Sequence, residues 1–324
     1  MNHLCGLPQY LNNSDSHVAL EPYELETLAA FRQRFYDSAP PMEDYTTTGE
    51  EKKDFECNET NLISRRVLTP QYEFPRDKLP PSGWRPLDDC TLYRFLLADR
   101  RKDGTFDEEA SYLRLMAALQ FRRQYRSDDI VHNMCNDVQP PAHVQKCQAM
   151  RVAIWAGTDY KSRPVVFERL GQFFSSGNAT RMTMEEWEEA YLHFIETTFW
   201  EMRQSSLSSG EAVDRFVYFA DFSGVVSSIM NRKIWKVIPL LKRLVSKVES
   251  HYPEMCDHIT LFNVPAVASA AYRVVRGFLD PVTADKIELF SGVPSERFKE
   301  MMGEDVVPLE YGGSNQCNYP QTLC

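Results

Sequence analysis

The first part of the chain has helical periodicity. In residues 20–35, apolar side chains recur three or four positions apart, at Leu25, Leu28, Phe31 and Phe35. This spacing predicts one amphipathic helix. The same period returns in residues 88–99 and 106–125. The stretch 38–84, which connects the first of these helices to the second, is rich in proline, threonine and charged residues. We therefore expect disorder there rather than a regulatory segment.

After residue 140 the pattern changes to alternating strands and helices. Residues 164–167 and 216–220 are short apolar runs, which is typical of buried parallel strands. Thr183 and Glu186 form a capping box that predicts the start of a long helix. Ser228 to Val248 has one apolar stripe, made of Ile234, Ile238, Leu241, Val245 and Val248. A helical front end followed by an α/β domain is the predicted architecture.

The segment His251 to Gly292 combines an apolar framework with one carboxylate and one amine of interest. We expect a strand over 259–262, an apolar helix, a stop at 279–281 and a second strand beginning at Lys286. Glu254 and Lys286 therefore lie at element ends. By spacing alone Glu254 is more typical of a solvated turn, and Lys286 of a surface charge.

The composition of the chain narrows the class of protein to which it can belong. The chain has 324 residues, 43% of them hydrophobic, and a formal net charge of -10, which favours a globular protein and argues against nucleic acid as partner. It contains no apolar run long enough for a membrane span and no secretory signal, so we expect a cytoplasmic protein. The eight cysteines are scattered without metal-ligand spacing. No nucleophile motif, metalloprotease motif or phosphate-binding loop occurs, so no enzyme, metal or cofactor is predicted.

Seven blocks carry a resemblance to a known family. They are TLYRFLLAD, SYLRLMAALQFRRQY, GTDYKSRPVVFERLG, DFSGV, HYPEMCDHITLFNVP, FLDPVTADKI and PLEYGG, in that order between residues 91 and 313. Together they resemble the CRAL-TRIO lipid-binding family, and more narrowly its phosphatidylinositol/phosphatidylcholine transfer proteins. The resemblance implies a helical N-terminal lobe and an α/β lobe. In the α/β lobe, a mostly parallel sheet would form the floor of a hydrophobic lipid pocket, and a gate helix would close this pocket.

The resemblance also suggests domain boundaries and a role. Residues 1–86 would be an N-terminal extension, 87–135 the helical lobe, 136–313 the lipid-binding domain and 314–324 a tail. The protein would be a monomer without enzymatic activity that holds phosphatidylinositol. It would visit membranes transiently and exchange the lipid between them, or present it to a phosphoinositide kinase. The alternatives are a carrier of a sterol or another isoprenoid and a lipid-sensing regulatory or scaffold protein.

The headgroup site implied by the resemblance consists of Glu254, Thr283, Lys286 and Arg100. The carboxylate of Glu254 would accept hydrogen bonds from inositol hydroxyls, while Thr283 and Lys286 would meet the lipid phosphate. The family's further phosphate-binding arginine falls where this chain is several residues longer. Strict counting places Asp99 there, and a shift by one residue places Arg100 there, which we favour because a carboxylate beside a buried phosphate is costly.

The chain departs from the family pattern in the pocket for a second ligand. The residues at the corresponding positions are Val166, Phe216, Tyr218 and Val248, next to Tyr252. The family has small hydroxyl-bearing side chains in this pocket, and this chain has bulkier ones. We therefore expect phosphatidylcholine to be lost as a ligand and any second ligand to be more apolar. Tyr218 also raises haem as an alternative, because tyrosine is a known axial ligand, but a packed tyrosine is the favoured interpretation.

Two further segments have a membrane interpretation. The apolar stripe Val267, Ala271, Val274 and Phe278 is explained by core packing, and the resemblance makes it the gate helix. Arg232, Lys233, Lys236, Lys242, Arg243 and Lys247 form a run of six cations without an acid before Glu249. A solvated helix face explains the run adequately, and docking to an anionic membrane is the alternative.

Overall fold

The computed structural model describes residues 20–38, 89–135, 138–209, 211–230, 234–266, 272, 276, 277, 279 and 281–316. It divides into two compact units: residues up to 129 together with 203–214, and residues 130–202 together with 215 onward. Each unit is described by itself. The predicted gate residues Val267, Ala271, Val274 and Phe278 lie outside the described residues, as does most of the stretch 38–84.

The first unit is helical. Its helices are α1 (Pro22–Ser38), α3 (Asp89–Ala98) and α4 (Glu108–Gln124), and α5 (Ser127–Cys135) begins in it. One core joins α1 to the helices that follow it: Leu28 and Phe31 of α1 are fully buried and pack in the same cluster as Leu92, Leu96 and Leu115. The helix α1 is thus an integral part of the helical unit.

The second unit is built around a five-stranded sheet. The strands are β1 (Ala153–Thr158), β2 (Pro164–Glu168), β3 (Phe216–Asp221), β4 (Cys256–Phe262) and β5 (Ile287–Leu289). Their spatial order is β1-β2-β3-β4-β5, with β1 antiparallel to β2 and all other neighbours parallel. The predicted mostly parallel sheet is confirmed, although β4 begins three residues earlier than the expected strand and β5 one residue later.

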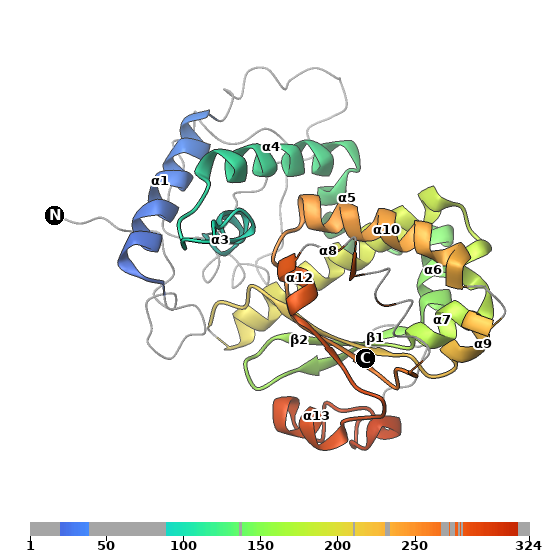
Figure 1. The fold of residues 1–324 in the computed structure, drawn as a ribbon. Helices are drawn as coiled ribbons and strands as arrows, with labels where there is room; N and C mark the ends of the chain where they lie inside the picture. The colour runs from blue at the N-terminus through green and yellow to red at the C-terminus, as the bar shows by residue number, and fades with distance from the viewer. Residues whose placement is uncertain are drawn as a thin grey trace. The chain divides into compact units, whose positions relative to one another are not determined.

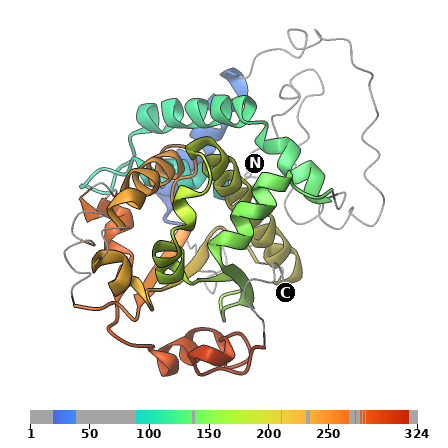
Figure 2. The same cartoon turned by 90° about the vertical axis from the view of Figure 1, so that its right-hand side faces the viewer.

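Helices cover both faces of this sheet. One face carries Phe167, Phe219 and Phe262, which pack against Phe298 of α13 (Ser295–Met302) and Tyr311 of η6 (Leu309–Tyr311). The other face lies toward the larger group of helices (Figure 1, Figure 2). These helices are α6 (Ala142–Arg151), α7 (Leu170–Ser176), α8 (Met184–Ser209), α9 (Val225–Met230) and α10 (Ile234–His251), with the short η5 (Asn178–Thr180) and α12 (Pro281–Asp285). We call this second side the inner face.

Local chemistry explains where the helices begin and end. The capping box that predicts the long helix is present: the Thr183 amide donates to Glu186 Oε2 at 2.8 Å, and the Glu186 amide donates to Thr183 Oγ1 at 3.2 Å. These two bonds satisfy donors that the first turn of α8 leaves free. In the segment 228–248, α9 ends at Met230 and α10 begins at Ile234, and residues 231–233 lie outside the described residues.

The apolar stripe predicted for 228–248 is not the buried face of α10. The fully buried side chains there are Val237, Leu240 and Leu244, whereas Ile238, Leu241, Val245 and Val248 are half-buried. The two sets lie on adjacent sides of one helix, because successive residues are 100° apart. Trp187, Ala190 and the α7 phenylalanines pack in one cluster with Val237, Leu240 and Leu244, and Leu241 of the stripe packs against this cluster.

Candidate functional site

The topology gathers charged residues at one edge of the sheet. Parallel strands start at the same edge, so the residues that precede β2, β3, β4 and β5 lie side by side. Those residues include Arg163, Arg215, Glu254 and Lys286, and Asp159 joins them because β1 runs antiparallel and ends there. We call this the amino edge of the sheet.

Glu254 and Lys286 form an ion pair at the amino edge. Lys286 Nζ lies 2.7 Å from Glu254 Oε2, and the two side chains are only 16% and 12% exposed. The backbone of Glu254 has a φ of 56°, in the left-handed region that costs a residue with a Cβ about 1 kcal/mol or more. Packing therefore holds this turn in a conformation that aims the carboxylate at the lysine.

Lys286 is positioned by its neighbours on both sides. Its carbonyl accepts a hydrogen bond from the amide of Ile259 in β4 at 3.0 Å, which fixes it to the sheet. Its amide donates to the carbonyl of Thr283 at 3.2 Å, at the end of α12. Thr283 is half-buried, and its hydroxyl has no hydrogen-bond partner among the described residues. The structure thus brings three of the four predicted headgroup residues together.

The fourth predicted residue, Arg100, lies in the helical unit. Its guanidinium is 3.2 Å from Glu24 Oε1 and also donates to the Tyr23 hydroxyl at 3.2 Å and to the Gly104 carbonyl at 3.1 Å. The competing residue Asp99 accepts two hydrogen bonds from Arg114, at 2.9 and 2.8 Å. Both residues therefore have partners within their own unit.

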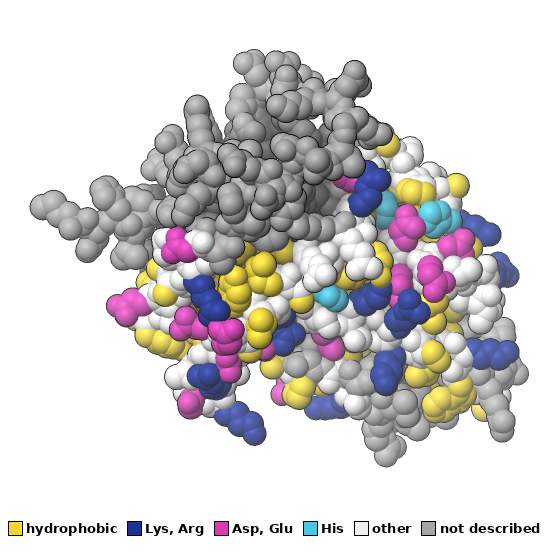
Figure 3. Space-filling view, turned by 90° about the horizontal axis from the view of Figure 1, so that it is seen from above, with side chains coloured by type: hydrophobic (Ala, Val, Ile, Leu, Met, Phe, Trp, Pro, Cys, Tyr) yellow, Lys and Arg dark blue, Asp and Glu magenta, His cyan; other side chains and the backbone are white. Residues whose placement is uncertain are grey.

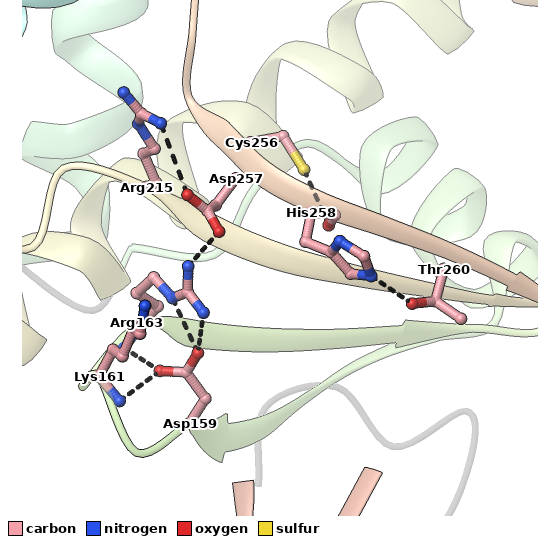
Figure 4. Close-up of polar contacts among 8 residues, drawn as sticks. All are labelled: Asp159, Lys161, Arg163, Arg215, Cys256, Asp257, His258 and Thr260. Atoms are coloured by element: carbon pink, nitrogen blue, oxygen red, sulfur yellow. Dashed lines mark hydrogen bonds and ion pairs between the residues drawn. The ribbon is translucent and has the colours of Figure 1, made fainter. Parts of the chain in front are cut away.

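A charged cluster continues the amino edge beyond Glu254 and Lys286 (Figure 4). Arg163 bridges two carboxylates, Asp159 and Asp257, and Arg215 lies 3.5 Å from Asp257. Burial alone raises the pKa of Asp257, but Arg163 and Arg215 outweigh burial and hold this pKa below its usual value. The ion pairs of this cluster connect the ends of β1, β2, β3 and β4.

Cys256 lies between this cluster and Lys286. Burial raises the pKa of its thiol to about 12, even though the positive charge of Lys286 acts in the opposite direction. A thiol with such a pKa is protonated at neutral pH and is a poor nucleophile. Its Sγ contacts the carbonyl of His258 at 3.4 Å.

The predicted second-ligand positions lie on or near the inner face. Val166 and Tyr218 are neighbours in the β2–β3 register, and Phe216 is buried at the start of β3. Val248 is half-buried on α10. Tyr252 is buried against α8, where its hydroxyl donates to Glu196 Oε1 at 2.7 Å. The positions are therefore largely apolar, and the hydroxyl of Tyr252 is already bound.

A buried polar group on the inner face was not predicted from sequence. Glu168, at the end of β2, accepts two hydrogen bonds from Arg151, at 2.9 and 2.6 Å, and one from the Tyr218 hydroxyl at 2.5 Å. The Arg151 guanidinium also lies 3.7 Å from the centre of the Phe194 ring. A buried charge needs such a partner. The feature of the sequence that could have indicated this buried charge is the acidic residue that directly follows the apolar run of residues 164–167.

The contact with Glu168 affects whether Tyr218 could act as an axial ligand of haem iron. Burial and the negative charge of Glu168 raise the pKa of Tyr218 well above its usual value. Axial ligation of haem iron by tyrosine uses the phenolate, which this environment disfavours. No group of three or more metal-ligating side chains is found within the described residues, and no helix in the described part of the chain is long and apolar enough to cross a membrane.

The fold is that of an α/β domain with a mostly parallel sheet, and comparison with known proteins identifies its family. The model of the CRAL/TRIO domain matches residues 148–313, which is just over half of the chain. The chain therefore belongs to the CRAL/TRIO domain family of lipid-binding proteins, and the resemblance seen in the seven blocks is confirmed.

Individual relatives are distant. The chain is 26% identical over 254 residues to the SEC14 cytosolic factor of Candida glabrata, a match that covers 74% of this chain and 76% of the relative. It is 26% identical over 242 residues to the phosphatidylinositol/phosphatidylcholine transfer protein SFH9 of Arabidopsis thaliana, with 74% of this chain covered. Some relatives are longer: the chain spans 39% of SFH9 and 34% of the protein real-time of Aedes aegypti.

A solved structure supports the fold. The crystal structure of Sfh5 superimposes with a TM-score of 0.60 and covers 92% of this chain and 89% of its own, at 15% sequence identity. At this identity the likeness shows the fold alone. The predicted fold class, a helical segment followed by an α/β unit with a mostly parallel sheet, is confirmed.

Proposed function

We propose that this protein binds phosphatidylinositol and exchanges it between membranes or presents it to a phosphoinositide kinase. The observation that carries the proposal is the sheltered pair of Glu254 and Lys286, with Thr283 joined to Lys286 through a backbone hydrogen bond. Similarity to the phosphatidylinositol/phosphatidylcholine transfer proteins SFH7 and SFH9 of Arabidopsis thaliana supports the same ligand class.

The ion pair suits exchange of partners with an inositol headgroup. An ammonium group binds a phosphodiester by charge-assisted hydrogen bonds, and a carboxylate accepts hydrogen bonds from a polyol. When the headgroup enters, the phosphate replaces Glu254 as the partner of Lys286, and inositol hydroxyls replace Lys286 as donors to Glu254. Neither charge is left buried and alone at any stage, which avoids a penalty of several kcal/mol.

Thr283 and Arg100 have secondary roles in this proposal. Thr283 donates its hydroxyl to the lipid phosphate from a position one helical turn before Lys286. Arg100 supplies a further cation only after it exchanges Glu24, Tyr23 and Gly104 for the lipid. We therefore expect substitution of Arg100 to weaken binding less than substitution of Lys286.

The inner face favours an apolar second ligand over phosphatidylcholine. Val166 and Phe216 have no polar side-chain atoms, and the hydroxyl of Tyr218 is already donated to Glu168. A choline lipid has no hydroxyl in its headgroup, so it donates no hydrogen bond to the carboxylate of Glu254. The protein acts in the cytoplasm and at membrane surfaces in this proposal.

The site is tested by lipid occupancy of purified protein. Native mass spectrometry of the full chain after incubation with phosphatidylinositol vesicles should show a one-to-one lipid complex for the wild type and loss of that complex for Lys286→Ala. Lys299→Ala is the matched control, because Lys299 also pairs with a glutamate, Glu296, but on α13. Circular dichroism checks that each variant is folded. A Lys286→Ala variant that is folded and carries phosphatidylinositol like the wild type would refute the site.

A further inference from the structure

Three large apolar side chains are exposed on α9 and at the start of α10. Met230 is 75% exposed, Trp235 48% and Val226 43%. Val226 and Met230 are four positions apart on α9 and therefore lie on the same side of that helix. A single exposed apolar residue needs no explanation, but a group of three beside charged residues is typical of an interaction site.

The periodicity of α10 aims two of its residues away from the core. Val237, Leu240 and Leu244 are buried and mark the inward side. Trp235 and Lys242 are seven positions apart, so they share one side, and that side is opposite to the buried one. Both are exposed. An indole and an ammonium group thus face solvent together.

The four described cations of this segment divide into two groups, while Arg232 and Lys233 lie outside the described residues. Between Phe222 and Val248 the chain carries six lysines and arginines and no acid, although its net charge is -10. Arg243 and Lys247 are used internally, because both pair with Glu188 of α8. Lys236 and Lys242 are exposed, and neither has an ion-pair partner in the part of the chain that the structure describes.

We propose that Val226, Met230, Trp235, Lys236 and Lys242 form the surface by which this protein docks onto an anionic lipid bilayer. We call it the α9–α10 surface. Tryptophan prefers the boundary between headgroups and acyl chains, and exposed methionine and valine can enter the same layer. Each lysine near such a surface strengthens binding about fivefold.

A bilayer fits this surface better than an acidic protein partner does. A lipid carrier must meet a membrane to exchange its cargo, and in this respect the inference rests on the proposed function. The apolar residues here project from α9 and from the first turn of α10 beside lysines, rather than lining a groove that would hold a peptide. Lys and Arg side chains stand beside hydrophobic ones toward the right of the face seen in Figure 3.

Vesicle co-sedimentation of the full chain tests the docking surface. Vesicles of phosphatidylcholine alone are compared with vesicles that contain 30% phosphatidylserine, a composition chosen as roughly that of an anionic leaflet. We expect binding to the anionic vesicles, little binding to the neutral ones, and loss of binding in high salt. Lys236→Ala combined with Lys242→Ala should lower the association constant about 25-fold. Trp235→Ala should lower it by about tenfold at unchanged charge.

Two matched substitutions control for nonspecific effects. Leu113→Ala removes an apolar side chain that is 60% exposed on α4, and Lys299→Ala removes a cation on α13, on the other side of the sheet. Both controls should bind anionic vesicles like the wild type. Equal vesicle binding by the wild type, Trp235→Ala and the double lysine variant would overturn the inference. Absence of vesicle binding by the wild type would also overturn it and direct attention to an acidic protein.

The same preparations separate this inference from the proposed function. Trp235→Ala should retain phosphatidylinositol in native mass spectra, because its position is outside the headgroup site. If Lys286→Ala loses the lipid and Trp235→Ala still binds vesicles normally, the docking surface is refuted and the headgroup site stands. If Lys286→Ala keeps the lipid while Trp235→Ala loses vesicle binding, the headgroup site is refuted and the docking surface stands.

Discussion

At the scale of single residues, the amino edge of the sheet shows how topology makes a site out of isolated charges. Glu254 and Lys286 are 32 positions apart, and each precedes a parallel strand. The family resemblance grouped these residues in the prediction, and the parallel strands, which start at the same edge, explain why they lie close together. Their mutual ion pair could not be foreseen, because it depends on the left-handed turn at Glu254.

Glu168 marks the limit of prediction for a buried charge. Its strand was predicted from the apolar run, but its partners come from α6 and β3. A single sequence does not state which distant arginine neutralises a buried acid. Arg151 reaches Glu168 because α6 packs onto the sheet. The spacing of residues within α6 or within β2 does not predict this contact.

A buried histidine, His193, and a half-buried one, His258, make the stability of the fold dependent on pH. Burial lowers the pKa of His193 and of His258 below the ordinary 6.5. The unfolded chain therefore takes up protons at a higher pH than the folded one, and stability should fall as the pH drops below about 6.5, by up to about 1.4 kcal/mol per pH unit for each histidine.

Urea unfolding at pH 7.5 and at pH 5.5 measures this effect. The transition midpoint should be lower at pH 5.5, and the combined substitutions His193→Gln and His258→Gln should flatten the dependence. The comparison with the variant is needed because burial raises the pKa of Glu201, which acts in the opposite direction. An equally steep dependence in the double variant would contradict the assignment.

At the scale of elements, the predictions were most secure where local chemistry alone decides. The capping box of α8 is formed by residues three positions apart, and it is present. The apolar stripe of α10 does not by itself say which side of the helix faces the core, since neighbouring helices decide between two adjacent apolar stripes.

Helix α1 should contribute to the stability of the helical unit. Phe31 is fully buried in a cluster with residues of α3 and α4, so Phe31→Ala should destabilise this unit by about 3–5 kcal/mol. Thermal unfolding followed by circular dichroism measures the loss. Glu26→Ala changes an exposed position of the same helix and should have little effect. An unchanged transition in Phe31→Ala would mean that α1 is a dispensable extension.

At the scale of the whole molecule, the two roles that we propose reside in separate parts of the α/β unit. Three of the proposed headgroup residues lie at the amino edge of the sheet, and the proposed docking residues lie on α9 and α10. Membership of the CRAL/TRIO domain family supports lipid binding in general. We propose that selectivity among lipids depends on the side chains of the inner face, above all those of Val166, Phe216 and Tyr218.

The most direct test of the account is a comparison of two transfer rates. Full-length protein is mixed with donor vesicles that carry labelled phosphatidylinositol or labelled phosphatidylcholine, and arrival of label in acceptor vesicles is followed. We predict rapid transfer of phosphatidylinositol, its loss in Lys286→Ala but not in Lys299→Ala, and no protein-dependent transfer of phosphatidylcholine. Equal transfer of both lipids, or transfer of phosphatidylinositol that is unaffected by Lys286→Ala, would contradict the account.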